Sequence, residues 1–103
     1  MGDDVPQAFR METGQIGGTD VVRIYGELDL VHADEVRLAL EAAPGNVVVD
    51  LSELEFIDST GLSSVLVARR HVEGRGKSLE IRGARGAVRK LFEAAGLADV
   101  LDD

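Results

Sequence analysis

The sequence predicts a single α/β domain in which a partly parallel sheet is covered by helices. Short apolar runs typical of strands alternate with segments whose apolar residues recur at helical spacing, and this alternation is regular in the second half of the chain. With 103 residues, the chain is long enough for one hydrophobic core and too short for two. The expected order of elements is β-β-α-β-α-β-α, and right-handed crossovers should join the parallel strands.

The first half of the chain predicts a hairpin followed by a helix. Two short strands are expected over 8–12 and 20–25, and the residues between them, 13–19, are rich in glycine and threonine and predict a turn. Apolar residues then recur at helical spacing from Ala33 to Ala43. Pro44-Gly45 should end this helix, because proline and glycine both interrupt helical backbone.

The N-terminal segment 1–7 is polar and includes Pro6, so we expect a flexible lead-in, with a single domain over 8–103. The N-terminus lacks the basic segment and the apolar segment that together make a signal peptide. No apolar run approaches the roughly 20 residues that span a bilayer. We therefore expect a cytoplasmic protein with no membrane segment.

The stretch from Asn46 to Arg70 organises the rest of the chain. Its apolar start, from Val47 to Leu51, suits a strand that is buried on both faces, and a second apolar patch follows at 54–57. The motif Asp58-Ser59-Thr60-Gly61 comes next. The segment after this motif has the apolar spacing of an amphipathic helix, with apolar residues at 62, 65, 66 and 72.

The end of the chain predicts a strand, a helix and a short last strand. The segment 78–82 alternates apolar and polar residues, as strands do. The third helix carries four apolar residues on one face: Val88, Leu91, Phe92 and Ala95. Gly96 stands one step past that helix, and Leu97 follows as the apolar residue that a glycine-terminated helix packs against. The segment 99–101 is expected to add the last strand.

The hydroxyl groups of Ser59 and Thr60 have two interpretations. The first backbone N–H groups of a helix have no partner within it, so Ser59 or Thr60 is suited to cap them. The same place also suits phosphorylation, because a phosphate there meets unpaired donors and the positive end of the helix dipole. Both interpretations can hold together, since an exposed capping hydroxyl stays within reach of a kinase.

The composition argues against several classes of function. The chain has no cysteine, which removes disulfides, thiol nucleophiles and thiolate metal sites. A formal net charge of −8 argues against direct binding of nucleic acid, which depends on Lys and Arg at the phosphates. Such an acidic surface favours a partner with a basic patch, or serves solubility alone.

The remaining motifs yield no catalytic residue set. Gly76-Lys77-Ser78 looks like the end of a phosphate-binding loop, but His71 stands where that loop needs a glycine, and a strand follows it. Asp50 ends a valine strand, as the phospho-accepting aspartate of a receiver domain does, but that site also needs acidic residues after the first strand to hold a metal ion. The two Asp-Asp pairs of this chain, Asp3-Asp4 and Asp102-Asp103, lie at its ends. His32 and His71 have no partners at ligand spacing, so we expect surface positions for both. We therefore expect no enzymatic activity, no metal and no cofactor.

Three motifs in register resemble the STAS domain in its stand-alone form, the anti-sigma factor antagonist. They are Gly26-Glu27-Leu28-Asp29, the segment VVVDLSELEFIDSTGL from Val47 to Leu62, and the segment AVRKLFEAAGL from Ala87 to Leu97. The resemblance covers nearly the whole chain from about Ala8 onward. It implies a STAS fold, which is a four- or five-stranded mixed sheet with helices packed against it, and no catalytic activity.

The resemblance also implies a role in the partner-switching control of bacterial sigma factors. An unphosphorylated antagonist of this family binds an anti-sigma factor that is also a serine kinase, so sigma is freed. The kinase then phosphorylates the antagonist and releases it, and a serine/threonine phosphatase resets the cycle. Carried to this sequence, the phosphorylated residue is Ser59, and Asp29 supports recognition by the kinase. The expected partner-binding residues are Asp29, Asp58, Ser59, Thr60 and Gly61.

Other uses of the same domain stay open. It is also attached to anion transporters, which the lack of a membrane segment disfavours, and it occurs as a subunit of large stress-sensing assemblies. A third use is as an accessory subunit in lipid transport, a binding role without phosphorylation. The chain departs from the family pattern at Ser63, where many members carry glycine two residues after Gly61, and a side chain there could alter how closely a partner approaches.

Overall fold

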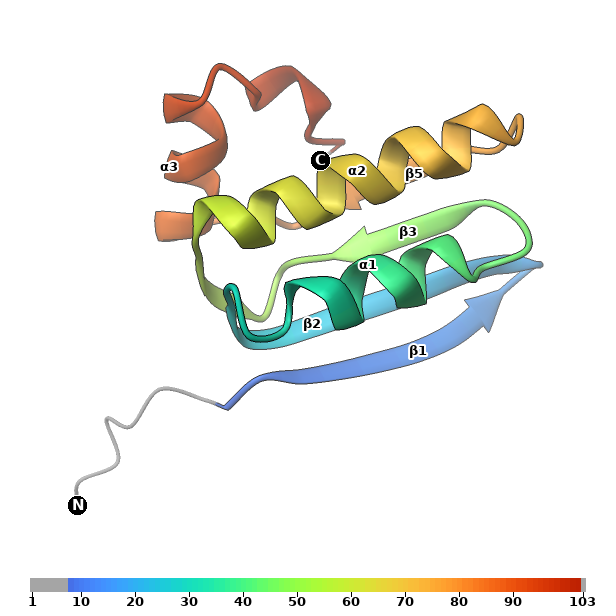
Figure 1. Cartoon of the computed structure of the whole chain (residues 1–103), viewed down its shortest axis with the longest axis horizontal. Helices are drawn as coiled ribbons and strands as arrows, with labels where there is room; N and C mark the ends of the chain where they lie inside the picture. The colour runs from blue at the N-terminus through green and yellow to red at the C-terminus, as the bar shows by residue number, and fades with distance from the viewer. Residues whose placement is uncertain (1–7, 103) are drawn as a thin grey trace.

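The computed structural model describes residues 8–102, which form a five-stranded mixed sheet with the helices α1 and α2 lying across one face (Figure 1). The elements of this part of the chain are β1 (Arg10–Ile16), β2 (Thr19–Leu28), α1 (Ala33–Glu41), β3 (Val47–Asp50), β4 (Leu54–Ile57), α2 (Ser59–Gly74), β5 (Leu79–Arg82), α3 (Gly86–Ala94) and a 3-10 helix (Ala98–Val100). The predicted α/β class and mixed sheet are confirmed. The predicted flexible lead-in, residues 1–7, lies outside the described residues.

The ten-residue strand β2 connects the parts of the sheet. β1 pairs with it antiparallel, from Arg10 opposite Tyr25 to Ile16 opposite Thr19. β3 runs parallel to the first half of β2, and β4 runs parallel to its second half. β5 pairs parallel with β3, which gives the order β1-β2-β3-β5 with β4 also on β2. The strands β3 and β4 therefore deliver successive parts of the chain to opposite ends of one long strand.

Strand β4 is missing from the predicted order of elements. Leu54 and Ile57 are buried, whereas Glu55 and Phe56 between them are exposed. The pairing of β4 with β2 also contains a register shift. An irregular strand of four residues lacks the strict alternation by which a strand is found in a sequence, so the sequence indicates only an apolar patch there.

The hairpin at the start of the domain is tighter than expected. The strands extend through most of the predicted turn at 13–19, and only Gly17 and Gly18 make the turn. Their φ angles of 58° and 83° are both positive, as a two-residue type I′ turn requires. The strand predicted at 8–12 overlaps β1, but its continuation to Ile16 is not visible in the sequence, because β1 is almost entirely exposed, with Met11 alone half-buried among its residues.

The short last strand that we expected at 99–101 is wrong. Residues Ala98–Val100 form a 3-10 helix, and Leu101 makes one isolated parallel bridge with Ile81. Asp102 holds this end of the chain on β5, because its N–H donates to the carbonyl of Ile81 (2.7 Å) and its carboxylate accepts from the N–H of Ile81 (3.0 Å). These two hydrogen bonds between Asp102 and Ile81 attach the end of the chain to β5, where a last strand would have formed a continuous series of backbone hydrogen bonds.

The hydrophobic core lies between the sheet and the helices. The helices predicted from the apolar spacing, α1 and α2, are confirmed, although Leu66 is half-buried and Ala68, which the prediction did not include, is buried on α2. The buried apolar residues of the two helices follow helical spacing. They are Ala33, Val36 and Leu40 on α1, and Leu62, Val65, Ala68 and Val72 on α2. In the part of the chain that the structure describes, none of the helices has the length and apolar character needed to cross a bilayer.

Helix α3 packs against β4 through Val88 and Phe92, whose side chains are both 0 % exposed. Leu91 is half-buried on the edge of this contact. Ala95, which we expected on the same face, is exposed and stands at the C-cap of the helix. The helix is therefore one turn shorter on its buried side than its apolar pattern predicts.

The glycine-terminated end of α3 is confirmed. Gly96 has a φ of 75°, in the left-handed region, and its N–H donates to the carbonyl of Glu93 (3.0 Å). The N–H of Leu97 reaches back to the carbonyl of Phe92 (2.8 Å), and the Leu97 side chain packs against the core. These two bonds satisfy carbonyls that the end of a helix otherwise leaves unpaired.

We predict that Phe92→Ala lowers the free energy of unfolding by about 3 to 5 kcal/mol, because it removes a fully buried ring and leaves a cavity. Urea denaturation measures this loss. Leu38→Ala is the matched control, since Leu38 is 57 % exposed on α1 and its truncation should change stability by less than about 0.5 kcal/mol. Equal losses in the two variants would contradict the packing of α3 on the sheet.

Candidate functional site

The predicted site residues lie where two parallel strands end side by side. The last residues of β2 and β4, Leu28 and Ile57, are paired in register. Asp29 and Asp58 follow directly, so residues 28 positions apart in the chain open neighbouring connections at one end of the sheet. In open α/β sheets, the carboxyl ends of parallel strands are the usual place for binding sites.

Asp58 joins these two connections. Its Oδ1 accepts a hydrogen bond from the N–H of Gly61 (2.8 Å), and its Oδ2 accepts from the N–H of Leu30 (3.3 Å). Its backbone N–H also donates to the carbonyl of Leu28 (3.2 Å). One side chain therefore holds both the first turn of α2 and the connection between β2 and α1.

The capping role that we gave to Ser59 or Thr60 is wrong, because Asp58 is the N-cap of α2. Asp58 has extended backbone angles (φ −99°, ψ 179°), which is the geometry of a capping residue, and aspartate is among the best capping side chains. Ser59 and Thr60 are the first two residues of the helix, and both are exposed. Neither hydroxyl has to close the helix, so both are presented to the solvent at its N-terminus.

Asp29 shapes the β2–α1 connection. Its Oδ1 accepts from the N–H of Val31 (3.0 Å), and its carbonyl accepts from the N–H of His32 (3.1 Å). Together with the bond from Leu30 to Asp58, these contacts fix the backbone of the connection from residue 29 to residue 32. The side chain of Asp29 thus has a local structural task, in addition to the recognition role that we predict for it.

Gly61 is buried, and its position allows α2 to approach β2 closely. A Cβ atom there would lie 2.4 Å from the carbonyl oxygen of Leu28, and 2.9 Å from the Cγ of the same residue. The hydroxyl of Ser64 donates to the carbonyl of Gly61 (2.6 Å) from one turn further on. The structure therefore gives Gly61 a packing role inside the domain, and its place among the partner-binding residues stays a prediction. Ser63, which lies between Gly61 and Ser64 in the sequence, is exposed.

The two histidines differ in their surroundings. His71 is exposed on α2, as we expected. His32 is half-buried: its ring stacks on Phe9, with centroids 3.9 Å apart and planes inclined by 7°, and its Nδ1 lies 3.2 Å from the Oε1 of Glu35. His32 therefore helps to fix the start of α1. Among residues 8–102, no group of three His, Cys, Asp or Glu side chains is arranged to hold a metal ion.

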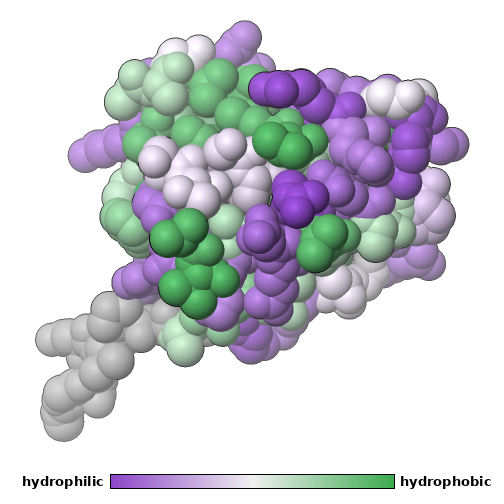
Figure 2. All heavy atoms as spheres, viewed as in Figure 1, coloured by the Kyte–Doolittle hydropathy of each residue, from purple (hydrophilic) through white to green (hydrophobic). Residues whose placement is uncertain are grey.

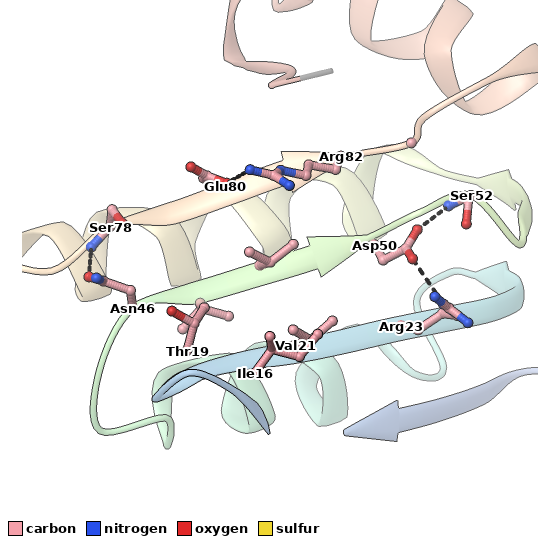
Figure 3. Close-up of a pocket in the computed structure, with 13 residues that line it drawn as sticks. Ile16, Thr19, Val21, Arg23, Asn46, Asp50, Ser52, Ser78, Glu80 and Arg82 are labelled. Atoms are coloured by element: carbon pink, nitrogen blue, oxygen red, sulfur yellow. Dashed lines mark hydrogen bonds and ion pairs between the residues drawn. The ribbon is translucent and has the colours of Figure 1, made fainter. Parts of the chain in front are cut away.

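Asp50 lies on the other face of the sheet, in an open hollow that β2, β3 and β5 line with both polar and apolar side chains (Figure 3). Its carboxylate accepts from Arg23 Nε (2.9 Å) and from the N–H of Ser52 (2.9 Å). Partial burial alone would raise the pKa of Asp50, but the hydrogen bonds from Ser52 and Arg23 outweigh it and leave the pKa below its usual range. Glu80 and Arg82, both on β5, form an ion pair at 2.5 Å along one side of this hollow. The charged residues that line the hollow are two basic and two acidic, so the hollow offers no net charge to a ligand.

The sequence interpretation missed Leu30 and Val31, which are 72 % and 78 % exposed next to the site. The signal was present in the sequence, because two large apolar residues directly follow the motif Gly26-Glu27-Leu28-Asp29. This signal alone does not identify a site, since nothing in the local sequence distinguishes an exposed apolar pair from the start of a buried helix.

A family model described as "Mlab, STAS domain" matches residues 11–102. The anti-sigma-B factor antagonist of Listeria monocytogenes is 34 % identical over 90 residues, which are 82 % of this chain and 79 % of that protein. The chain therefore belongs to the STAS domain family. Its similarity to such relatives places it in the anti-sigma factor antagonist branch of that family.

Solved structures agree with this assignment. The anti-sigma factor antagonist SpoIIAA in its unphosphorylated form is 28 % identical, with a TM-score of 0.77 over 93 % of this chain and 87 % of that chain. The phosphorylated form of SpoIIAA from Bacillus is 27 % identical, with a TM-score of 0.70 over 93 % and 90 %. An antagonist from Mycobacterium paratuberculosis is 26 % identical, with a TM-score of 0.80 over 94 % and 86 %.

We predict that Gly61→Ala lowers the free energy of unfolding by about 1 to 3 kcal/mol, because the added methyl group meets the backbone oxygen of Leu28. Gly74→Ala is the matched control in the same helix. A Cβ at Gly74 meets nothing within 4 Å, and alanine is favoured over glycine in a helix, so this variant should be at least as stable as the natural chain. Urea denaturation compares the three proteins, and a Gly61→Ala variant as stable as Gly74→Ala would disprove the close approach.

We further predict that Asp58→Ala lowers stability by about 0.5 to 2 kcal/mol through loss of the cap. Thr60→Val should change stability by less than about 0.5 kcal/mol, since Thr60 is exposed and does not cap the helix. Thermal melting separates these expectations, and hydrogen exchange should show weaker protection of the N–H groups of Leu30 and Gly61 in Asp58→Ala only. A larger loss in Thr60→Val than in Asp58→Ala would restore the capping role to Thr60.

Proposed function

We propose that this protein is an anti-sigma factor antagonist that acts by partner switching. In its unphosphorylated form it binds an anti-sigma factor that is also a serine kinase. The kinase phosphorylates Ser59 and releases the protein, and a serine/threonine phosphatase returns it to the binding form. The protein itself acts by binding and carries out no catalysis, in the cytoplasm and without direct contact to nucleic acid.

The observation that carries this proposal is the position of Ser59. Its side chain is exposed at the first residue of α2, while Asp58 closes the helix in its place. A kinase can therefore reach the hydroxyl without breaking a helix cap. The relatives named as antagonists, and a related structure that carries phosphate, support the same role.

The charges around Ser59 explain how phosphorylation would act as a switch. A phosphate adds about −1.5 to −2 charges at neutral pH. Asp58 is adjacent in the chain, and Asp29 opens the neighbouring connection, so the new charge joins two carboxylates at one end of the sheet. Within an interface that excludes water, such like charges repel strongly and weaken binding. Release of the partner then needs no change of fold.

The proposal is tested by incubating the protein with ATP and with the anti-sigma factor serine kinases of the source organism. We predict that one of them phosphorylates the natural chain and that Ser59→Ala abolishes the reaction while keeping the binding. Ser59→Asp should weaken binding on the order of 1 to 3 kcal/mol, which is roughly tenfold or more in affinity. Thr60→Val, the matched control at the neighbouring hydroxyl, should be phosphorylated like the natural chain.

Phosphopeptide mapping decides between the two hydroxyls. Phosphate on Thr60 with Ser59 unmodified contradicts the assignment of the switch. A chain that none of these kinases binds or phosphorylates contradicts the antagonist role as a whole, and it favours the remaining use of the domain, as a binding subunit of a stress-sensing or lipid-transport assembly.

A further inference from the structure

We propose that Leu30 and Val31 form an apolar anchor for the partner, and that the partner receives them in an apolar pocket bordered by Lys and Arg side chains. We call these two residues the Leu30–Val31 tip. The inference rests on the proposed function, because it names the partner chemistry of the same site. It adds a source of affinity that is separate from the serine that would be switched.

The exposure of the tip is the first argument. Leu30 and Val31 are 72 % and 78 % exposed, although large apolar side chains are usually buried. Figure 2 shows a hydrophobic patch over the connection between β2 and α1, with hydrophilic atoms beside it. A small apolar projection of this kind can enter a pocket on a partner and there lose its contact with water, which is the main driving force of such contacts.

The rigidity of the tip is the second argument. The N–H of Leu30 is bound by Asp58, and the N–H of Val31 is bound by Asp29. The N–H of His32 closes the connection onto the carbonyl of Asp29 (3.1 Å). A loop that is already held in one conformation loses little entropy on binding, so more of the gain from apolar burial appears as affinity. The bond to Asp58 also keeps the tip next to Ser59.

The charge around the tip specifies the partner. The segment 28–36, which includes the tip, contains three acidic residues and no Lys or Arg. The next basic residue along the chain, Arg37, is paired with Glu41 (3.2 Å) and lies near Asp34 (3.7 Å). Four acidic residues belong to the tip's own surroundings: Asp29, Asp34, Glu35 and Asp58. An apolar projection with an acidic border fits an apolar pocket with a basic border, because complementary charge steers encounter and rejects acidic partners.

The test uses the kinase that phosphorylates Ser59, with ADP in place of ATP so that binding is measured without phosphoryl transfer. Isothermal titration calorimetry compares the natural chain with the double variant Leu30→Ser/Val31→Ser. We expect the double variant to bind at least tenfold more weakly. Ile16→Ser is the matched control, since Ile16 is equally exposed (74 %) but pairs with Thr19 at the opposite end of β2. Its affinity should stay within twofold of the natural chain.

A second pair of measurements tests the charge border. Asp34→Asn/Glu35→Gln should lower the association rate and flatten its dependence on salt, because it removes two exposed acidic groups from the border. All variants change exposed side chains, so thermal melting should find midpoints close to that of the natural chain. An unchanged salt dependence would contradict the basic border of the partner pocket.

The outcomes separate this inference from the proposed function. If the double variant binds the kinase within twofold of the natural chain while Ser59→Asp binds more weakly, the switch stands and the anchor is refuted. If no kinase binds or phosphorylates the natural chain, the proposed function fails and the anchor fails with it. If Ile16→Ser binds the kinase more weakly by the same factor as the double variant, the anchor is also refuted, because any exposed apolar-to-serine change would then lower the affinity wherever it lies.

Discussion

The carboxylate of Asp58 is the contact on which the site depends. One oxygen caps α2 through Gly61, and the other holds Leu30 in the connection that precedes α1. Two segments that are far apart in sequence therefore share one acceptor group at the end of the sheet. Because the cap is made by Asp58, the serine that follows it can be exposed at the helix start without a cost in helix stability. Asp58 thus stabilises the start of the helix, and the neighbouring Ser59 is left exposed.

The sheet supplies the frame for this contact. β2 is long enough to pair with β3 along its first half and with β4 along its second half, so Asp29 and Asp58 emerge next to each other. Gly61 then lets the first turn of α2 lie directly on the backbone of Leu28. A larger side chain at residue 61 would push the helix start away from β2 and lengthen the bond from Leu30 to Asp58. The distance between the start of α2 and the β2–α1 connection is therefore set by the packing of Gly61 on Leu28.

Much of this arrangement follows from local sequence patterns, and the rest depends on contacts between distant residues. The helical spacing of Val36 and Leu40 predicts α1, and glycine in the correct place predicts the end of α3. β4 escapes such reasoning because its burial does not alternate. The identity of the residue that caps α2 also cannot be read from the sequence. Asp58, Ser59 and Thr60 are consecutive and all of them are good capping types, so spacing does not distinguish them. The exposed tip at Leu30 and Val31 is fixed by a carboxylate 28 residues later, which no local pattern reveals.

The exposed strand β1 has a consequence for the cooperativity of the domain. Its residues contribute backbone hydrogen bonds to β2 but little apolar burial, since only Met11 is half-buried among them. Local opening costs least where few apolar contacts must be broken. β1 can therefore separate from β2 at a lower free energy than that of global unfolding, as a foldon of its own, while the parallel strands and the core remain folded. Such an opening leaves Asp58 and the helix that it caps in place, because its N–H donates to Leu28 and its carboxylate accepts from Leu30 and Gly61, none of which belongs to β1.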